Sequence, residues 1–479
     1  MSRAPSTSWT GVHGILPGLR RDPIRTLVQA WSECGDVARL QLGPPVLGQV
    51  GHLLVHPTAV EHVLVRNSAN YQLSAGYEVL RHFLGDGLLT SHGEGWKRHR
   101  RMAQPVFAAA RLQRVAPSFV DAAGDAVERL AASQALVDLP AEMARLTLDA
   151  VGRTLLGAST VESAAAVAPA LGVVQEYAIR TLYSPTPVWA RGAARRLPTA
   201  RARRYLAAVR TLDDVVGALV QERVRTAGEG DDLLGVLLAS GQGAPPDPRA
   251  VRDEVMTFLL AGHETTAAAL TWTLALLSRH PEVRQRVHEE LDEVLDGRPV
   301  TQEDLARLPQ LDAVLKESLR HFPPSWMLER QAQAADVVSG FDIPGGSTVV
   351  LSPYLTHRHP DFWANPEGFE PDRWLNGGTP GRGAYLPFGA GARQCIGGAF
   401  ATLEASLMLA TLLQRLTMDL APGQTLSPVP RITLTAADGL RVRVTPRGAA
   451  GPQGERRVPG ARREAEHGDA PARPAAAQR

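Results

Sequence analysis

The amino-acid sequence predicts an α+β fold, mainly α, in which one large helix-rich domain carries a smaller β region. Three observations support this prediction. The pattern from about residue 66 to residue 301 is mainly helical, strand-like segments gather in separate blocks, and neither repeats nor a linker divide the body. We expect an extension over residues 1–15, one domain over 16–446 and a disordered tail over 447–479. The tail is rich in Gly, Pro, Ala and Arg and lacks aromatic residues, so it cannot bury enough apolar surface to fold.

The expected elements follow in chain order. "DVARLQLG" and "LGQVGHLLV" indicate two strands, and a short helix should follow from about Pro57 to Val65. The clearest helix runs from about Pro248 to His280, is apolar on nearly every face at its centre, and ends at Pro281. "LDAVLKESLRHF" predicts another helix that stops at Pro323. Short strands should follow, and the last core helix should begin after Cys395.

Composition limits the classes of function. Of the 479 residues, 44% are apolar and 21% charged, as in an ordinary globular protein. The tail after Pro446 holds seven arginines against four acidic residues, a net +3, so the total of +2 leaves −1 for the body. A near-neutral body argues against nucleic acid as a partner. No apolar run approaches the roughly 20 residues of a membrane span, and Cys34 and Cys395 form no disulfide framework, so we expect a cytoplasmic protein.

A polar patch interrupts the long apolar helix. Gly262 lies mid-helix, where glycine costs about 1 kcal/mol relative to alanine, and the polar run His263–Thr266 follows it. The hydroxyls of Thr265 and Thr266 favour a local break of the helix, which would make a small polar pocket suited to a diatomic molecule, a water and proton delivery. The alternative is a helix face that emerges into water. A His-Glu-x-x-His zinc site is ruled out because Ala267 stands at the second histidine position.

Other polar groups are ambiguous by themselves. Glu317 and Arg320 share one helix face, as do Trp96 and Arg100, and such patterns are usually solvated surface. The run His357–His359 could suggest a metal, but no carboxylate or cysteine cluster in the sequence supports one.

Cys395 lies in a glycine-rich loop, "YLPFGAGARQCIGGAF", just before the last helix. The helix amides and dipole should favour its thiolate, and Gly389, Gly391 and Gly397 allow sharp turns and close backbone approach. Arg393 can neutralise an anion or hold a carboxylate. A nucleophilic enzyme would need a basic partner, and no cysteine-hydrolase signature is present. A single thiolate suits one axial metal bond, as in a haem.

With these motifs assembled, the chain resembles the cytochrome P450 family. "FGAGARQCIG" matches the family's cysteine loop, "AGHETT" its oxygen-activating helix, "KESLR" its Glu-x-x-Arg helix and "FEPDRW" the segment that completes a buried triad. The motifs occur in the family's order, and the resemblance extends from about residue 16 to residue 444. It implies the P450 fold and a soluble bacterial monooxygenase.

The resemblance also implies residue roles. Cys395 would be the thiolate ligand of the iron of haem b, with Phe388 in the same loop beside the cofactor. Glu264 and Thr265 would relay protons to dioxygen, while Ala261 and Gly262 line the oxygen groove. Glu317, Arg320 and Arg373 would form an internal ion network that holds the cysteine loop. The haem propionates would be bound by Trp96, Arg100, Arg330 and Arg393, with help from His92.

The implied partners are dioxygen, an apolar small molecule and a separate electron donor, either a ferredoxin or a flavodoxin with its reductase. A docking face could comprise Lys97, Arg98, Arg101 and Arg111, although an ordinary solvated face is nearly as good an interpretation. The substrate walls implied by family geometry are Phe83, Leu84, Leu88, Leu89, Phe258, Ala261, Ser325, Trp326, Met327 and Leu328, with a turn near residues 435–438. This apolar set suits a terpenoid, another secondary metabolite or a fatty acid, and biosynthetic tailoring is favoured over lipid catabolism.

Two alternative functions remain. A peroxide-driven peroxygenase would use the same haem, but such relatives usually lack an acid–threonine pair, so Glu264 and Thr265 argue against it. A non-catalytic haem sensor would need neither that pair nor a large pocket, and the sequence contains no signalling domain.

Overall fold

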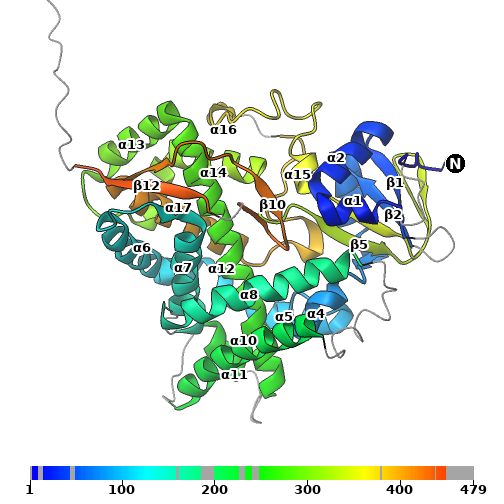
Figure 1. Cartoon of the computed structure of the whole chain (residues 1–479), viewed down its shortest axis with the longest axis horizontal. Coiled ribbons are helices and arrows are strands. Elements are labelled where there is room, and N and C mark those ends of the chain that lie inside the picture. The colour runs from blue at the N-terminus through cyan, green and yellow to red at the C-terminus, as the bar shows by residue number, and fades with distance from the viewer. Residues whose placement is uncertain are drawn as a thin grey trace, which may run out of the picture.

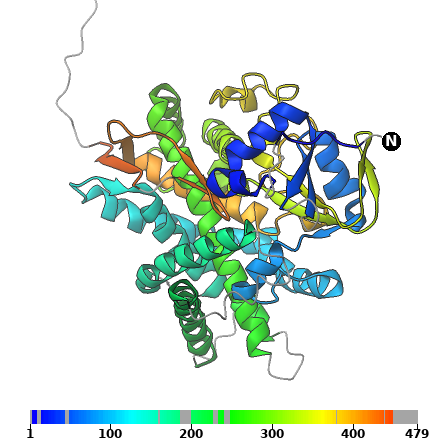
Figure 2. The ribbon, with the colours of Figure 1, turned by 45° about the vertical axis from the view of Figure 1, so that its right-hand side comes forward.

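The computed structural model describes residues 3–8, 14–43, 49–157, 161–184, 199–225, 232–239, 247–377, 380–436 and 439–448. A small β-rich region with α1 and α2 lies on one side, and a large helical region occupies the rest (Figure 1). Helix α12 (Pro248–Arg279) crosses the middle of the molecule (Figure 2). The predicted α+β, mainly α class is confirmed.

The β-rich region is built on one five-stranded sheet with the order β1-β2-β8-β5-β3. The predicted strand pair is present as β1 (Val37–Leu42) and β2 (Gln49–Leu54), which are antiparallel with Val37 opposite Leu54. The predicted helix follows as α3 (Pro57–Glu61) and a π-helical turn. β5 (Leu328–Ala332) pairs with β8 (Thr348–Leu351) on one side and β3 (Tyr71–Leu73) on the other.

Helix α12 forms where it was predicted because both ends carry stop signals. The Asp247 side chain caps the first turn by accepting a hydrogen bond from the Arg249 amide at 2.9 Å, and Pro248 occupies the first helical position. His280 ends the helix, and Pro281 begins α13 (Pro281–Leu295). From Leu270 to Leu277 every side chain is buried, so this helix forms the centre of the core.

The remaining elements surround α12 and the sheet. The predicted helix before Pro323 is α14 (Pro309–His321), and the helix after Cys395 is α17 (Gly398–Arg415). The other α-helices are α1 (Leu16–Arg21), α2 (Pro23–Cys34), α4 (Tyr77–Leu84), α5 (Gly93–Ala103), α6 (Ala109–Ala131), α7 (Leu139–Val151), α8 (Val161–Leu182), α10 (Ala200–Arg225), α11 (Leu233–Ala239), α15 (Pro353–Thr356) and α16 (Asp372–Leu375). The other strands are β4 (Val137–Asp138), β6 (Asp336–Val338), β7 (Phe341–Ile343), β9 (Leu416–Leu420), β10 (Pro428–Pro430), β11 (Leu434–Ala436) and β12 (Arg441–Pro446).

Contacts of the described residues extend beyond both expected domain boundaries. Ala4 is buried, and the Pro5 carbonyl accepts a hydrogen bond from the Arg39 amide at 2.7 Å, so part of the expected extension packs on β1. At the other end Arg447 donates to Asp292 at 2.6 Å and to the Leu413 carbonyl at 2.9 Å, so it belongs to the body rather than the tail. The tail prediction otherwise concerns residues 449–479, which lie outside the described residues. Within the described residues, no helix is long and apolar enough to cross a membrane.

Candidate active site

The polar patch of α12 faces a cavity inside the protein. Ala261 is exposed and Gly262, Glu264 and Thr265 are half-buried, although the residues on either side of this stretch are buried. The predicted break in the helix is wrong: α12 is continuous from residue 248 to residue 279. The Thr265 hydroxyl donates to the Ala261 carbonyl at 2.6 Å, but without opening the helix.

Glycine at position 262 is explained by packing. A Cβ atom there would lie 2.9 Å from a methyl group of Val151 on α7, closer than real Cβ contacts allow. The Thr147 hydroxyl of the same helix donates to the His263 carbonyl at 2.8 Å. Two helices therefore touch at this point, and α12 presents its opposite, polar side to the cavity.

Glu264 is tied to a different helix. The Gln175 amide of α8 donates to Glu264 Oε1 at 2.5 Å, and Gln175 itself is buried. Burial raises the pKa of Glu264, while Gln175, the nearby Thr433 hydroxyl and the charge of Arg431 act in the opposite direction. The carboxyl group therefore retains its proton to a higher pH than an exposed glutamate does.

The cysteine loop turns sharply around its glycines. Gly389 and Gly391 have φ values of 67° and 71°, and a Cβ atom at Gly391 would lie 1.8 Å from the Leu64 carbonyl oxygen. The Cys395 amide donates to the Phe388 carbonyl at 2.9 Å, which closes the loop. The loop thereby places the Cys395 sulfur in the wall of the cavity.

The thiol chemistry differs from the sequence expectation. Burial raises the pKa of Cys395, whereas the Gly397 amide and the charge of Arg100 lower it by smaller amounts. The loss of solvation therefore outweighs the stabilisation of the thiolate that was expected from the helix start. A cation at the sulfur would reverse this balance.

Three arginines converge beside the cysteine without an acidic partner. Arg100 donates to the Gln394 carbonyl at 2.8 Å, Arg393 donates to the Ser91 carbonyl at 2.7 Å, and both guanidinium groups lie over the Trp96 ring. Burial, together with the charges of Arg330 and Arg100, lowers the pKa of Arg393 to about 10. None of Arg100, Arg330 and Arg393 forms an ion pair with an acidic residue of the described chain, so the group is suited to bind an anion.

One cavity of about 430 Å³ joins these groups. Its walls are mostly apolar side chains from α4, α8, α12 and α17 and from the segment that follows α14. The sequence-predicted residues that line it are Leu88, Leu89, Trp96, Arg100, Phe258, Ala261, Gly262, Glu264, Thr265, Ser325, Trp326, Met327, Leu328, Arg330, Phe388, Arg393 and Cys395.

Some predicted residues lie elsewhere. His92 caps α5 and does not line the cavity, and burial followed by the charge of Arg393 lowers its pKa. Phe83 and Leu84 are buried core residues behind the wall. The turn that closes the cavity is residues 431–433 rather than residues 435–438, of which 437 and 438 lie outside the described residues.

The Glu317 pair is part of the core. Glu317 and Arg320 have no exposed surface and are joined by two hydrogen bonds of 2.8 and 2.9 Å. Glu317 also accepts from Arg373 at 3.1 Å and from the Trp374 indole at 2.8 Å. Burial alone would raise the pKa of Glu317, but Arg320, the Glu370 amide and the charge of Arg373 lower it below its ordinary value.

A chain of hydrogen bonds connects this ion network with the cysteine loop. Arg320 donates to the His357 carbonyl at 3.0 Å, and His357 Nε2 accepts from the Leu386 amide at 2.8 Å. Burial lowers the pKa of His357 to about 3, so the ring stays neutral and can accept this bond. Leu386 lies two residues before Phe388, where the loop begins.

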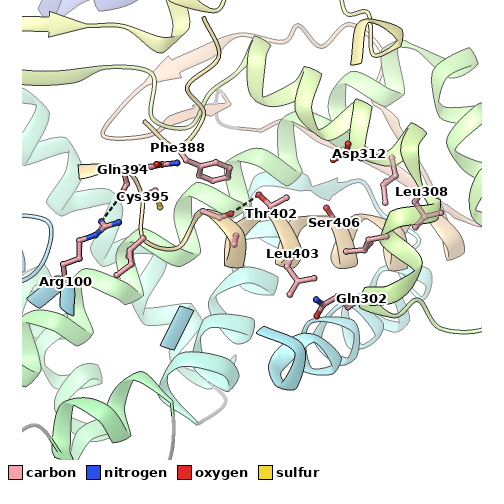
Figure 3. Close-up of a pocket in the computed structure, with 15 residues that line it drawn as sticks. Arg100, Gln302, Leu308, Asp312, Phe388, Gln394, Cys395, Thr402, Leu403 and Ser406 are labelled. Atoms are coloured by element: carbon pink, nitrogen blue, oxygen red, sulfur yellow. Dashed lines mark hydrogen bonds between the residues drawn. The ribbon is translucent and has the colours of Figure 1, made fainter. Parts of the chain in front are cut away.

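A second, more open hollow of about 820 Å³ lies beside the cysteine (Figure 3). It shares Arg100, Thr402 and the cysteine-loop residues Phe388, Gln394, Cys395 and Ile396 with the cavity. Its other walls come from α17, α14 and the segment before α14, with none from α12. Exposed residues Lys97, Arg98 and Arg101 of α5 flank Arg100 in sequence, while Arg111 is only half-buried and donates to the Thr154 carbonyl.

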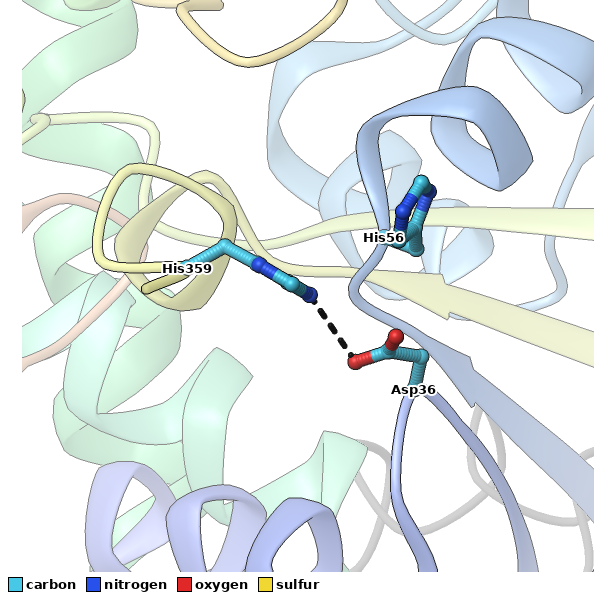
Figure 4. A group of neighbouring side chains, drawn as sticks. All are labelled: Asp36, His56 and His359. Carbon is cyan, nitrogen blue, oxygen red and sulfur yellow. Dashed lines mark hydrogen bonds and ion pairs between the residues drawn. The ribbon is translucent and has the colours of Figure 1, made fainter. Parts of the chain in front are cut away.

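The structure adds a carboxylate to the histidine run that the sequence analysis set aside. Asp36 accepts a hydrogen bond from His359 Nε2 at 3.1 Å, and His56 lies alongside (Figure 4). Both histidines accept backbone N–H bonds at Nδ1, from Thr58 and from Asp361. Each neutral ring therefore carries its proton on the Nε2 atom that a metal would need, and we interpret the group as a structural hydrogen-bond cluster.

The family model for cytochrome P450 matches residues 5–438 of this chain. The chain belongs to the cytochrome P450 family. Among its relatives are cyclooctatin synthase of Streptomyces melanosporofaciens, 35% identical over 88% of this chain and 91% of the relative, and pentalenene oxygenase of Streptomyces avermitilis, 34% identical over 91% and 98%. Another is cyclooctat-9-en-7-ol 5-monooxygenase of Streptomyces melanosporofaciens, 34% identical over 89% and 93%.

This P450 is therefore a haem enzyme of the monooxygenase class, so the sensor alternative is not retained. The family binds haem b through a cysteine thiolate. The cavity fits that group: its wall contains a single cysteine, and three arginines without acidic partners are available for two propionates.

Sequence reasoning missed several polar residues in or beside the cavity of this P450. Glu404 on α17 has no exposed surface, accepts a hydrogen bond from Thr266 at 2.9 Å and has a pKa raised to about 8 by burial. An acidic residue inside the apolar run "GAFATLEASLMLA" was the available signal. No comparable signal marked Gln175 on α8 or Tyr183 directly after it, because this segment carries no motif.

Proposed function

We propose that this P450 inserts one oxygen atom into an apolar terpenoid, with Cys395 as the ligand of the haem iron. The observation that supports this most is the single cavity in which Cys395, the Glu264–Thr265 stretch and mostly apolar walls meet. The names of the Streptomyces relatives refer to terpenoids, so a terpenoid is favoured over a fatty acid as the substrate class and biosynthetic tailoring over lipid catabolism.

When bound, the haem would supply the oxidation of an unactivated C–H bond: substrate, dioxygen, two electrons and two protons give hydroxylated substrate and water. Arg100, Arg330 and Arg393, with Trp96 beside them, would hold the propionates, and Phe388 would pack beside the cofactor. The guanidinium carbons of Arg100 and Arg393 lie 5.9 and 4.6 Å from the centre of the Trp96 ring. These contacts hold both guanidinium groups in the cavity wall, where they can bind a carboxylate.

Glu264 would supply protons and Thr265 would pass them to dioxygen. The raised pKa of Glu264 keeps a proton available, and its position in the cavity wall allows delivery without bulk water. Glu264 and Thr265 have no direct hydrogen bond in the described structure, so a bound water would connect them. Leu88, Leu89, Phe258, Trp326 and Met327 would contact the substrate.

Electrons would come from a ferredoxin or flavodoxin with its reductase. Lys97, Arg98 and Arg101 are exposed on α5, the helix whose Arg100 lines the hollow of Figure 3, and these positive charges would attract an acidic partner. Arg111 is less suited, because it is half-buried and bonded to a backbone carbonyl.

The test is an optical titration of the purified ferric protein with terpenoids, fatty acids and polyketides. A ligand that displaces the axial water shifts the iron toward high spin. We expect terpenoids to produce this shift and to be oxidised when a ferredoxin system supplies electrons. A response to fatty acids alone would overturn the terpenoid assignment, and product formed only with hydrogen peroxide would favour a peroxygenase.

A further inference from the structure

The cavity contains a buried hydroxyl group without a partner at the end of α8. Tyr183 lines the cavity, its side chain is only 4% exposed, and its hydroxyl oxygen has no hydrogen-bond partner among the described residues. A buried hydroxyl that lacks a protein partner must bond to water or to a ligand, so this one marks a point of the cavity wall where a polar ligand atom can bind.

The surroundings of Tyr183 form a polar corner, which we define as Tyr183, Glu329, Ser74 and Gly76. The Ser74 hydroxyl donates to Glu329 Oε2 at 2.7 Å and accepts from the Gly76 amide at 3.1 Å. A Cβ atom at position 76 would lie 2.6 Å from Glu329 Oε2 and 2.9 Å from a methyl group of Leu182, so with any other residue there these side chains would have to shift. Apart from Ser74, these residues all line the cavity.

The charge of the corner selects the kind of ligand. Burial and the nearby Glu329 charge raise the pKa of Tyr183, so its hydroxyl stays protonated and can donate. The Glu329 carboxylate disfavours another carboxylate at the same place. A neutral oxygen, as in an alcohol, ether or ketone, fits both conditions.

We propose that the Tyr183 hydroxyl binds a neutral oxygen atom already present on the substrate, so that this P450 acts on an oxygenated terpenoid, foremost an alcohol, rather than on a hydrocarbon. This inference rests on the proposed monooxygenase function and narrows its substrate class. The reaction that supplies the substrate is then an oxygenation or a water-quenched cyclisation. Tyr183 acts as a specificity residue, because the remaining walls beside it, such as Leu73, Ile179 and Leu182, are apolar.

The test uses the ferric holoprotein and the substitution Tyr183→Phe, which removes only the hydroxyl group. Affinities are measured by optical titration with matched pairs: farnesol and farnesene, cedrol and cedrene, dodecanol and dodecane, with dodecanoate as the anionic probe. Tyr177→Phe is the control, since Tyr177 lies on α8, which ends just before Tyr183, but packs on Tyr205 outside the cavity wall.

In the unsubstituted protein we expect the alcohol of at least one pair to bind about tenfold more tightly than its hydrocarbon. Tyr183→Phe should abolish that preference and leave hydrocarbon affinity unchanged, while Tyr177→Phe should keep it. The ligand-free melting temperature of Tyr183→Phe should be unchanged or about one degree higher, because an unpartnered buried hydroxyl is removed.

The proposal is overturned if Tyr183→Phe lowers the melting temperature when Tyr177→Phe does not, since the hydroxyl would then have a structural partner. Equal loss of alcohol and hydrocarbon affinity, a preference for hydrocarbons, or silence of every pair on intact haem would also overturn it. A Tyr183-dependent preference seen only with dodecanol would leave the oxygen subsite in place and reject the terpenoid function. If terpene hydrocarbons bind as tightly as their alcohols, the terpenoid function stands and the oxygen subsite is rejected.

Discussion

Gln175 on α8 donates a 2.5 Å hydrogen bond to Glu264 on α12 and so joins two helices that both line the cavity. The acidic residue of the "AGHETT" stretch is thereby positioned by a residue 89 positions earlier in the chain. The hydrogen bond also opposes the effect of burial on the pKa of Glu264. Removing it should change how the protein responds to pH.

Substitution Gln175→Leu should shift the alkaline limb of the rate profile to higher pH. Glu264 donates only while it is protonated, so product formation falls as the pH rises through its pKa, and loss of the Gln175 bond raises that pKa further. The measurement is product formed per minute against pH with the best ligand of the titration panel. Thr181→Val is the control, because the Thr181 hydroxyl bonds only to its own helix carbonyl. A limb that stays in place would mean that Glu264 does not limit the rate.

Substitution Glu264→Gln should lower product formation roughly 100-fold, the usual scale of a lost general acid.

Thr265→Ala should act mainly on coupling, so that more of the electrons consumed are released as hydrogen peroxide. For each variant, the oxidised substrate and the hydrogen peroxide are both measured per NADH oxidised. Unchanged coupling in Thr265→Ala would remove Thr265 from the proton relay.

Substitution Cys395→Ser should abolish the thiolate signature of the carbon monoxide difference spectrum, since serine offers an oxygen in place of sulfur. Cys34→Ser is the matched control, as Cys34 is the other cysteine of the chain and does not line the cavity. An unchanged spectrum in Cys395→Ser would contradict the assignment of the iron ligand.

Substitution Glu317→Gln should destabilise the fold by about 3–5 kcal/mol, because it leaves Arg320 buried with an uncompensated charge. The free energy of unfolding is measured by denaturant titration, and the haem content of the purified protein should fall with it. Lys316→Gln in the exposed Lys316–Asp312 pair of the same helix should change stability by less than about 1 kcal/mol. Equal effects of the two substitutions would show that the buried network does not carry stability.

Substitution Glu404→Gln should change the pH dependence of stability. The pKa of Glu404 is raised to about 8 in the folded protein, above its unfolded value, so the folded state holds a proton that the unfolded state has lost. Stability should then fall as the pH rises from about 5 to 8, by at most about 1.4 kcal/mol per pH unit. Glu404→Gln should remove this part of the decline in denaturant titrations at several pH values. Parallel pH curves for the two proteins would place the Glu404 pKa near its ordinary value.

The sequence contained the information for the main helices and strands and for two parts of the candidate site, the polar stretch of α12 and the cysteine loop. Stop signals set both ends of α12, and glycines marked the cysteine loop, because these features depend on residues close together in the chain. The predicted break at Gly262 failed for a tertiary reason: the glycine makes room for Val151 of α7, and the helix stays intact.

What the sequence by itself determined is the family, the cysteine loop and the acid–threonine stretch, since each is a local pattern with fixed spacing. Only the tertiary structure decided which groups face them. It placed Gln175 on Glu264, three arginines without acidic partners beside Cys395, and the unpartnered Tyr183 hydroxyl next to Glu329. These relationships join segments far apart in the chain, and they arise because burial removes water and leaves each polar group only the partners that packing brings to it.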